Sequence, residues 1–539
     1  MWPLLVRPTV RLVQSDAFCR AWRPLADSDF LFRSLFILFA VILPIAMVQD
    51  TSEKERRGFN YHHSDVLRKI PPEVISNIFL AYIEMGRPES ATSSATKLAT
   101  VCKTWCNIVR STPRLWTTLV IYGRIILSKE AHLFVKQWIS RSKALPIDLY
   151  IFETRQHHRT FYYQWHEHLT NIQLATVLAE SSNRWRSILF DVHASFIRQL
   201  CGIAQGLSQL RSVKYGFTCL ERSPAKAGSL LWREPISPGI FKIRSELSGS
   251  LAEAFNIRVD SLTYLKVKEV SAERCIDLIR SSPVLRFIKI GLTDPVEDAA
   301  FIPPPPVVHE SLESFTIVLS PKPDSLDRVL SSLTLPGLRT LGLDMVGSQD
   351  LNVVEDFLRR SSAPIESMEL MYEQEGHERT LQSFQAIAAL TPSLIRLTVI
   401  FDDILGKHNI ENVGTTILKY LVETGKPKHD DPSYTPPLPL LQSLAYTSVR
   451  INIPTLIPCN ILPGLFPFST PGSGEPSLRP LKAFLTTECF PLQETYLRAL
   501  VPLRQAGVDF GRRNKSIESV GGTALTREEG TSARSRRSS

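Results

Sequence analysis

Apolar residues recur along most of the chain in one short pattern: two apolar positions three residues apart, followed by a third apolar position two residues later. This spacing is typical of a short strand with one buried face. Successive copies begin 23 to 29 residues apart, except for two intervals that are about twice as long. The triplets that carry the pattern are Trp185-Ile188-Phe190, Leu210-Val213-Tyr215, Leu262-Leu265-Val267, Leu285-Ile288-Ile290, Leu312-Phe315-Ile317, Leu338-Leu341-Leu343, Ile365-Met368-Leu370, Leu394-Leu397-Val399 and Leu441-Leu444-Tyr446.

Segments between these strands place apolar residues three or four positions apart, which predicts helices. Ser271 is a suitable N-cap for the first of them, and Arg280 suits the negative end of its dipole. The helices are expected to end before a proline, because proline lacks an N–H and restricts the residue before it. They span Ala272–Arg280, Leu351–Arg360 and Leu381–Leu390.

A single strand and helix cannot bury their own apolar faces, so such units must stack on their neighbours. Repeats of 20–29 residues are typical of leucine-rich repeats. We therefore expect residues 119–505 to form an irregular α/β solenoid of that kind. Residues 407–437 are polar and rich in proline, which indicates an insertion within it. The alternative is an ordinary α/β domain in which the three-residue spacing arises by chance.

Residues 64–118 follow a different pattern, which predicts a compact module of three short helices. Pro71 and Pro72 open the first helix, where a missing N–H costs nothing, and Glu73 adds favourable charge. A polar loop at 86–96 separates two apolar stripes, and Pro113 ends the second. The first stripe contains Val74, Ile75, Ile78, Phe79 and Tyr82, and the second contains Leu98, Val101, Cys102, Trp105, Ile108 and Val109. A module this small cannot bury so much apolar surface alone, so a partner or the adjoining repeats must cover the rest.

The same module resembles the F-box family in three successive blocks of residues. The chain departs from the family at Ile70, where leucine is usual, and in the longer loop between the helices. An F-box followed by loose repeats resembles the large F-box families of fungi. The three blocks are Ile70-Pro71-x-Glu73-Val74-Ile75-x-x-Ile78-Phe79, Leu98-x-x-Val101-Cys102-Lys103-x-Trp105-x-x-Ile108 and Pro113-x-Leu115-Trp116.

This resemblance implies a non-enzymatic substrate receptor of an SCF-type ubiquitin ligase, whose F-box holds a Skp-type adaptor and, through it, a cullin. The repeat region would bind an unknown protein target. The overall fold class is then α+β, a three-helix module followed by the α/β solenoid. The adaptor would contact Ile70, Pro71, Pro72, Val74, Ile75, Ile78 and Phe79, and the core of the F-box would contain Leu98, Val101, Cys102, Trp105, Ile108, Pro113, Leu115 and Trp116.

The net charge of +9 suggests a nucleic-acid partner at first, but much of the excess lies near the chain ends. The segment from Gly511 onward carries seven Lys or Arg against three Glu and lacks apolar periodicity. We therefore expect residues 506–539 to be a disordered basic tail and expect no nucleic-acid partner. The eight cysteines form no CxxC pair, which favours reduced thiols in a cytoplasmic or nuclear protein.

Residues 1–63 form a poorly defined leader with an uncharged apolar run from Ser34 to Val48. As a helix this run would span about 22 Å, short of the roughly 30 Å hydrocarbon core unless residues 31–32 join it. Three interpretations stay open: a membrane anchor through residues 31–48, a targeting segment, and an extension absent from the mature protein, which we favour. An anchor would suggest a membrane-tethered or ubiquitin-independent F-box scaffold instead.

The sequence offers no catalytic constellation, and we expect neither a metal nor a cofactor. The histidines at 157, 158, 166 and 168 lack the spacing of a zinc site and lie in a polar segment. The Gly472-Ser473-Gly474 turn lacks the flanking residues of a phosphate-binding loop. An enzymatic function is therefore not predicted.

Overall fold

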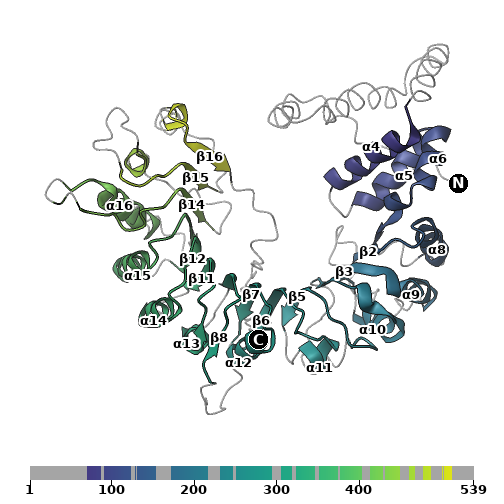
Figure 1. Ribbon diagram of the computed structural model, residues 1–539, viewed down its shortest axis with the longest axis horizontal. Coiled ribbons are helices and arrows are strands. Elements are labelled where there is room, and N and C mark those ends of the chain that lie inside the picture. The colour runs from purple at the N-terminus through teal and green to yellow at the C-terminus, as the bar shows by residue number, and fades with distance from the viewer. Residues whose placement is uncertain are drawn as a thin grey trace, which may run out of the picture. The chain divides into compact units, whose positions relative to one another are not determined.

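The computed structural model shows a mixed α/β protein with parallel strands, as expected at that level (Figure 1). The chain divides into two compact units, residues 1–209 and 210–539, so the division falls inside the region expected to form one array. The structure describes residues 70–512 except 87–89, 123–127, 129, 153–171, 193, 217–230, 247–250, 294–304, 319–322, 346–350, 374–376, 403–412, 429–430, 432, 449–460, 468–476, 487–500 and 502.

The first unit joins a helical module to a short run of alternating strands and helices. Its strands β1, β2 and β3 pair in parallel and in chain order. The module consists of α4 (Pro72–Met85), α5 (Ala91–Val101), α6 (Lys103–Ser111) and the 3-10 helix η4 (Pro113–Trp116). After it come β1 (Thr118–Tyr122), α8 (Ala131–Arg141), β2 (Ile147–Phe152), α9 (Ile172–Ala179), η6 (Ser182–Arg184), β3 (Trp185–Asp191), α10 (Ala194–Ile203) and η7 (Leu207–Gln209).

The second unit is one long parallel sheet with helices between most of its strands. Its strand order is β4-β5-β6-β7-β9-β11-β12-β13-β14-β15-β16, and β8 and β10 form a separate parallel pair. The strands are β4 (Ser212–Tyr215), β5 (Ile240–Glu246), β6 (Tyr264–Val270), β7 (Phe287–Leu292), β8 (Val307–Val308), β9 (Ser314–Val318), β10 (Leu333–Thr334), β11 (Thr340–Met345), β12 (Ser367–Glu373), β13 (Arg396–Asp402), β14 (Ser443–Ser448), β15 (Ala483–Thr486) and β16 (Asp509–Arg512). The helices are α11 (Leu251–Phe255), α12 (Ala272–Ser281), α13 (Pro323–Ser332), α14 (Leu351–Ser361), α15 (His377–Leu390), α16 (Val413–Gly425) and η10 (Leu462–Leu465).

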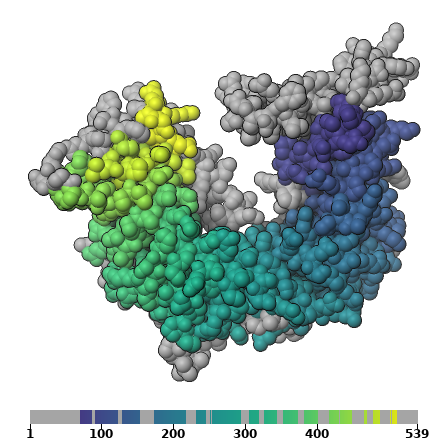
Figure 2. Space-filling model, viewed as in Figure 1, coloured from purple at the N-terminus to yellow at the C-terminus, as the bar shows by residue number. Residues whose placement is uncertain are grey.

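The apolar triplets form the core, as their spacing predicts. Each of the nine triplets overlaps a strand, and every side chain in them is at most 3% exposed. Helices α12 to α16 each pack against the next one along the sheet (Figure 1). In the space-filling view, the teal and green residues of the second unit pack side by side without interruption (Figure 2).

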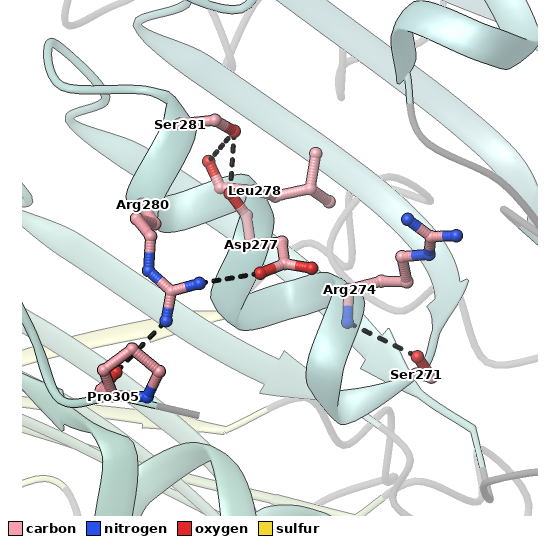
Figure 3. Close-up of polar contacts among 7 residues, drawn as sticks. All are labelled: Ser271, Arg274, Asp277, Leu278, Arg280, Ser281 and Pro305. Atoms are coloured by element: carbon pink, nitrogen blue, oxygen red, sulfur yellow. Dashed lines mark hydrogen bonds and ion pairs between the residues drawn. The ribbon is translucent and has the colours of Figure 1, made fainter. Parts of the chain in front are cut away.

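The expected helix boundaries are confirmed at the start of α12 (Figure 3). The backbone N–H of Arg274 donates to the Ser271 hydroxyl at 3.4 Å, so Ser271 is the N-cap. Near the end of the helix, Arg280 donates to Asp277 at 2.8 Å and to the carbonyl oxygen of Pro305 at 3.1 Å. Arg280 therefore ties α12 to the chain segment just before β8.

Two predictions about the second unit are wrong. The segment at 407–437 is not a polar insertion throughout, because it contains α16, which buries Ile417, Leu418 and Leu421. Its carboxyl end is held by Arg479, which donates to Thr424 at 2.7 Å and to the carbonyl oxygen of Leu421. The expected disorder from residue 506 is also wrong for β16, which pairs with β15.

The apolar triplets did not predict all of the strands. β5 lies in one of the double-length intervals, so a strand with a weaker apolar signal occupies that gap. β2 and β15 lie outside the nine triplets and also pair in parallel with their neighbours.

Several expectations concern residues outside the described part of the chain. These are the leader at 1–63, its apolar run, the histidine segment and the tail beyond residue 512. Among the helices that the structure does describe, none combines the length and apolar character needed to cross a bilayer.

Candidate docking surface on the helical module

The first turn of α4 presents apolar residues to solvent. Pro71 is the N-cap, with φ −56° and ψ 138°, and Pro72 takes the first helical position. The Pro71 carbonyl oxygen accepts from the N–H groups of Val74 and Ile75 at 3.0 and 3.3 Å. Both prolines are exposed, and Val74 is 43% exposed. A stiff apolar turn therefore remains accessible at the start of this helix.

The adjacent face of α4 builds the core of the module. Ile75 and Phe79 are 2% and 1% exposed, and the Phe79 ring lies 4.7 Å from the Trp105 ring, centroid to centroid. These two residues are four positions apart and share one side of the helix. Ile70 and Ile78 are half-buried at its edge. The prediction that Ile75 and Phe79 offer surface to a partner is therefore wrong.

A break at Cys102 changes which residues of the second stripe are buried. Cys102 is extended, with φ −157° and ψ 170°, and its sulfur accepts a hydrogen bond from the backbone N–H of Trp105 at 3.5 Å. Helix α5 ends before it and α6 begins after it, so the apolar spacing does not continue across the break. Val101 and Cys102 are exposed, which corrects their assignment to the core.

The other predicted core positions are buried or half-buried. Leu98, Trp105 and Ile108 are buried, as are Leu115 and Trp116 on η4, while Pro113 is half-buried. No proline or glycine marks the break at Cys102, so the sequence carries no evident signal that would have separated α5 from α6. The start of α5 at Ala91 likewise lies within the segment expected to be a loop.

A hydrogen bond and a ring contact attach the module to the rest of the first unit, and a second buried hydrogen bond lies within the module. The Thr92 hydroxyl accepts the Val120 N–H at 2.7 Å and joins α5 to β1. The indole N–H of Trp116 donates to the Val109 carbonyl oxygen at 2.7 Å. The Trp116 ring also meets the edge of Trp138 on α8, 4.5 Å between centroids. The module that carries the exposed turn of α4 is therefore fixed to β1 and α8 by buried contacts.

A partly buried cation lies against the same tryptophan. The Arg141 guanidinium carbon stands 4.5 Å from the centre of the Trp116 ring. Burial and, to a smaller extent, the nearby Arg110 lower the pKa of Arg141. A cation over an indole ring is a favourable contact, so this arrangement stabilises the base of the module.

The described residues contain no group of three or more His, Cys, Asp or Glu side chains that could hold a metal ion. Cys275, on α12, is buried, and burial raises the pKa of its thiol, which keeps it protonated at neutral pH. The exposed turn of α4 is therefore the feature of the module that most needs an explanation.

No family model matches the chain. No curated protein matches it significantly.

Proposed function

We propose that residues 70–116 form an F-box that docks on a Skp-type adaptor, and that the protein is a substrate receptor of an SCF-type ubiquitin ligase. The observation that carries the proposal is the apolar first turn of α4. Pro71, Pro72 and Val74 are exposed there, directly beside the buried Ile75 and Phe79. Apolar side chains grouped on a rigid surface are typical of a binding site for another protein.

The order of the three sequence blocks supports the same proposal. The residues that an F-box core requires at Leu98, Trp105 and Ile108 are buried, and so are Leu115 and Trp116. The resemblance and the burial pattern are separate observations, since one rests on residue identity and the other on packing. Docking would then involve Ile70, Pro71, Pro72, Val74 and Ile78, with Ile75 and Phe79 supporting them from beneath.

We further propose that the second unit is a leucine-rich-repeat-type solenoid that selects the target protein. Its main sheet adds strands strictly in chain order, with β8 and β10 set aside as a separate pair. The apolar triplets are buried along the whole series. Such arrays commonly bind partners along their exposed strands. A receptor of this class needs no catalytic residues, because other subunits of the ligase transfer ubiquitin.

Titration calorimetry of the full-length chain with a purified Skp-type adaptor tests the docking proposal. We would replace Val74 by glutamate, which adds charge to the exposed turn and yet suits the first turn of a helix. The affinity should fall at least tenfold, because a charge would face an apolar groove. Leu133→Glu is the matched control, since Leu133 is also exposed and apolar but lies on α8.

The outcomes separate clearly. Loss of binding in Val74→Glu alone supports docking through α4. Equal affinity in wild type and Val74→Glu would reject this surface. A wild-type chain that does not bind the adaptor would reject the F-box assignment itself.

A further inference from the structure

One face of α6 is exposed and consists of polar and basic side chains. The opposite face of the helix belongs to the core of the module, where Trp105, Ile108 and Val109 are buried. The exposed residues follow each other at intervals of one or three positions, which places them on one side of a helix. They are Lys103, Thr104, Asn107, Arg110 and Ser111. This face therefore contains neither an apolar side chain nor a carboxylate.

Positive charge in this part of the module is not balanced by nearby residues of the sequence. Residues 90–117, which include α5, α6 and η4, contain four Lys or Arg against no Asp or Glu, a formal charge of +4. None of the four cations forms an ion pair within the described part of the chain. They are Lys97, Lys103, Arg110 and Arg114, and all four are exposed.

Two cations at the end of α6 are close enough to repel each other. Burial and, to a smaller extent, repulsion by Arg110 lower the pKa of Arg141 on α8. At the other end of the helix, Lys103 takes the first position, and the first turn contains no acidic residue. A positive charge there is unfavourable for the helix dipole. A negatively charged ligand on this face would offset both effects.

The composition of the face distinguishes between kinds of anionic partner. The centre of a protein–protein interface is typically enriched in aromatic side chains, and helices that bind a membrane surface insert an apolar face. Single-stranded nucleic acids stack their bases on aromatic side chains. The exposed face of α6 has none of these features. Interfaces with duplex DNA are more polar and more positively charged, so duplex DNA fits this face best.

The dimensions of α6 also suit duplex DNA. The helix has nine residues, which corresponds to a length of about 13.5 Å. Lys103 and Arg110 are separated by about 10.5 Å along its axis. The major groove of DNA is about 12 Å wide and admits an α-helix. Cations near both ends of the helix can therefore reach phosphate groups, with Thr104 and Asn107 between them.

We propose that the exposed face of α6 binds double-stranded DNA, chiefly through its phosphate groups. Lys103 and Arg110 neutralise phosphates, and Thr104 and Asn107 donate hydrogen bonds. Contacts of this kind depend strongly on salt and carry little sequence information. The inference goes beyond the proposed adaptor docking, which uses a different helix. It also departs from the expectation drawn from the net charge, because a total does not reveal a local cluster of cations.

Fluorescence anisotropy with the full-length chain and a labelled duplex of sixteen base pairs tests the proposal. The affinity is measured from about 50 to 200 mM sodium chloride. Lys103→Gln/Arg110→Gln should lower it about tenfold at the lowest salt, and the slope of log affinity against log salt should become shallower by about 1.8, since each lost phosphate contact contributes about 0.9. Asn107→Asp keeps the shape of the side chain and should also weaken binding, because it adds a negative charge to the face.

Lys426→Gln/Lys482→Gln is the matched control, because it removes the same charge from exposed positions of the second unit. It should leave the affinity and the slope unchanged. The basic segment after residue 511 is present in every variant, so its contribution cancels in the comparison. All variants should retain wild-type thermal stability and adaptor binding.

Equal affinity and slope in the wild type and Lys103→Gln/Arg110→Gln would overturn the inference. Poly-glutamate and vesicles of phosphatidylserine and phosphatidylcholine serve as the other anionic probes. If Lys103→Gln/Arg110→Gln weakened the binding of either probe as much as that of the duplex, the face would recognise an acidic protein or a membrane instead, and the inference would also fail. None of these results bears on Val74, so this inference and the docking proposal can fail separately.

Discussion

Two buried tryptophans of the helical module differ in a way that substitution can isolate. The Trp116 indole N–H donates to the Val109 carbonyl oxygen at 2.7 Å. The Trp105 indole N–H is also buried but finds no hydrogen-bond partner in the part of the chain that the structure describes. Phenylalanine keeps a ring at either position and removes the N–H. Trp116→Phe therefore breaks a hydrogen bond, whereas Trp105→Phe removes an unsatisfied donor.

The free energies of unfolding should differ accordingly. Each substitution loses on the order of 1 kcal/mol of apolar burial from the smaller ring. Trp116→Phe costs about 1 kcal/mol more, at the low end for a lost buried hydrogen bond, because the Val109 oxygen still accepts the Thr112 N–H at 3.4 Å. Trp105→Phe regains about 1 kcal/mol as the unpaired donor disappears. The two variants should differ by about 2 kcal/mol.

Hydrogen exchange with mass spectrometry on the intact protein measures this difference, because it reports the local opening of peptides from α4 to η4. Trp138→Phe serves as control, since the Trp138 indole N–H is likewise unpaired and buried in that part of the structure. Trp105→Phe and Trp138→Phe should retain near wild-type protection of their own helices. A Trp105→Phe chain that loses as much protection as Trp116→Phe would refute the reasoning.

Three further predictions concern the second unit and its glycine, cysteine and arginine side chains. Gly291→Ala should lower the free energy of unfolding by about 2 kcal/mol in thermal melts, because a Cβ there would lie 1.8 Å from the Lys268 carbonyl oxygen. Gly202→Ala is the control and should be neutral or stabilising, because a Cβ there would have nothing within 4 Å. Equal losses of stability in the two variants would contradict this prediction. Burial raises the pKa of Cys275, so the unfolded chain releases this proton first and stability falls as the pH rises above about 8.5. Urea titrations from pH 7.5 to 10 should therefore show a shallower loss in Cys275→Ala, and parallel curves would rule out this contribution. Burial lowers the pKa of Arg479 to about 10, and its guanidinium donates hydrogen bonds to the Pro437 carbonyl oxygen and the Thr424 hydroxyl. Arg479→Met should lower the free energy of unfolding by about 2 kcal/mol, because it leaves these acceptors unpaired. Hydrogen exchange should then become faster at the end of α16 but not at the end of α12.

Local pattern alone determined a large part of this fold. The triplets predicted β3, β4, β6, β7, β9 and β11 to β14, because the apolar side of a strand must be buried whichever neighbour covers it. Helices α12, α14 and α15 were predicted with the end before the following proline, since that signal is local too. Strands β5 and β15 lack the full apolar triplet, so their sequence signal is weaker, and they became evident only through their pairing with neighbouring strands.

Only the tertiary structure decided which surfaces stay open. Spacing identifies residues that share a helix face, but it does not say whether another part of the same chain covers that face. Ile75 and Val74 are adjacent apolar residues, yet Ile75 is buried in the core of the module and Val74 faces solvent. The alignment of four lysines in one register also required tertiary information, because they lie 23 to 28 residues apart and meet only through the pairing of four strands. They are Lys214, Lys242, Lys266 and Lys289. Sequence separation is set by the lengths of helices and loops, whereas register is set by how the buried faces of neighbouring strands fit together.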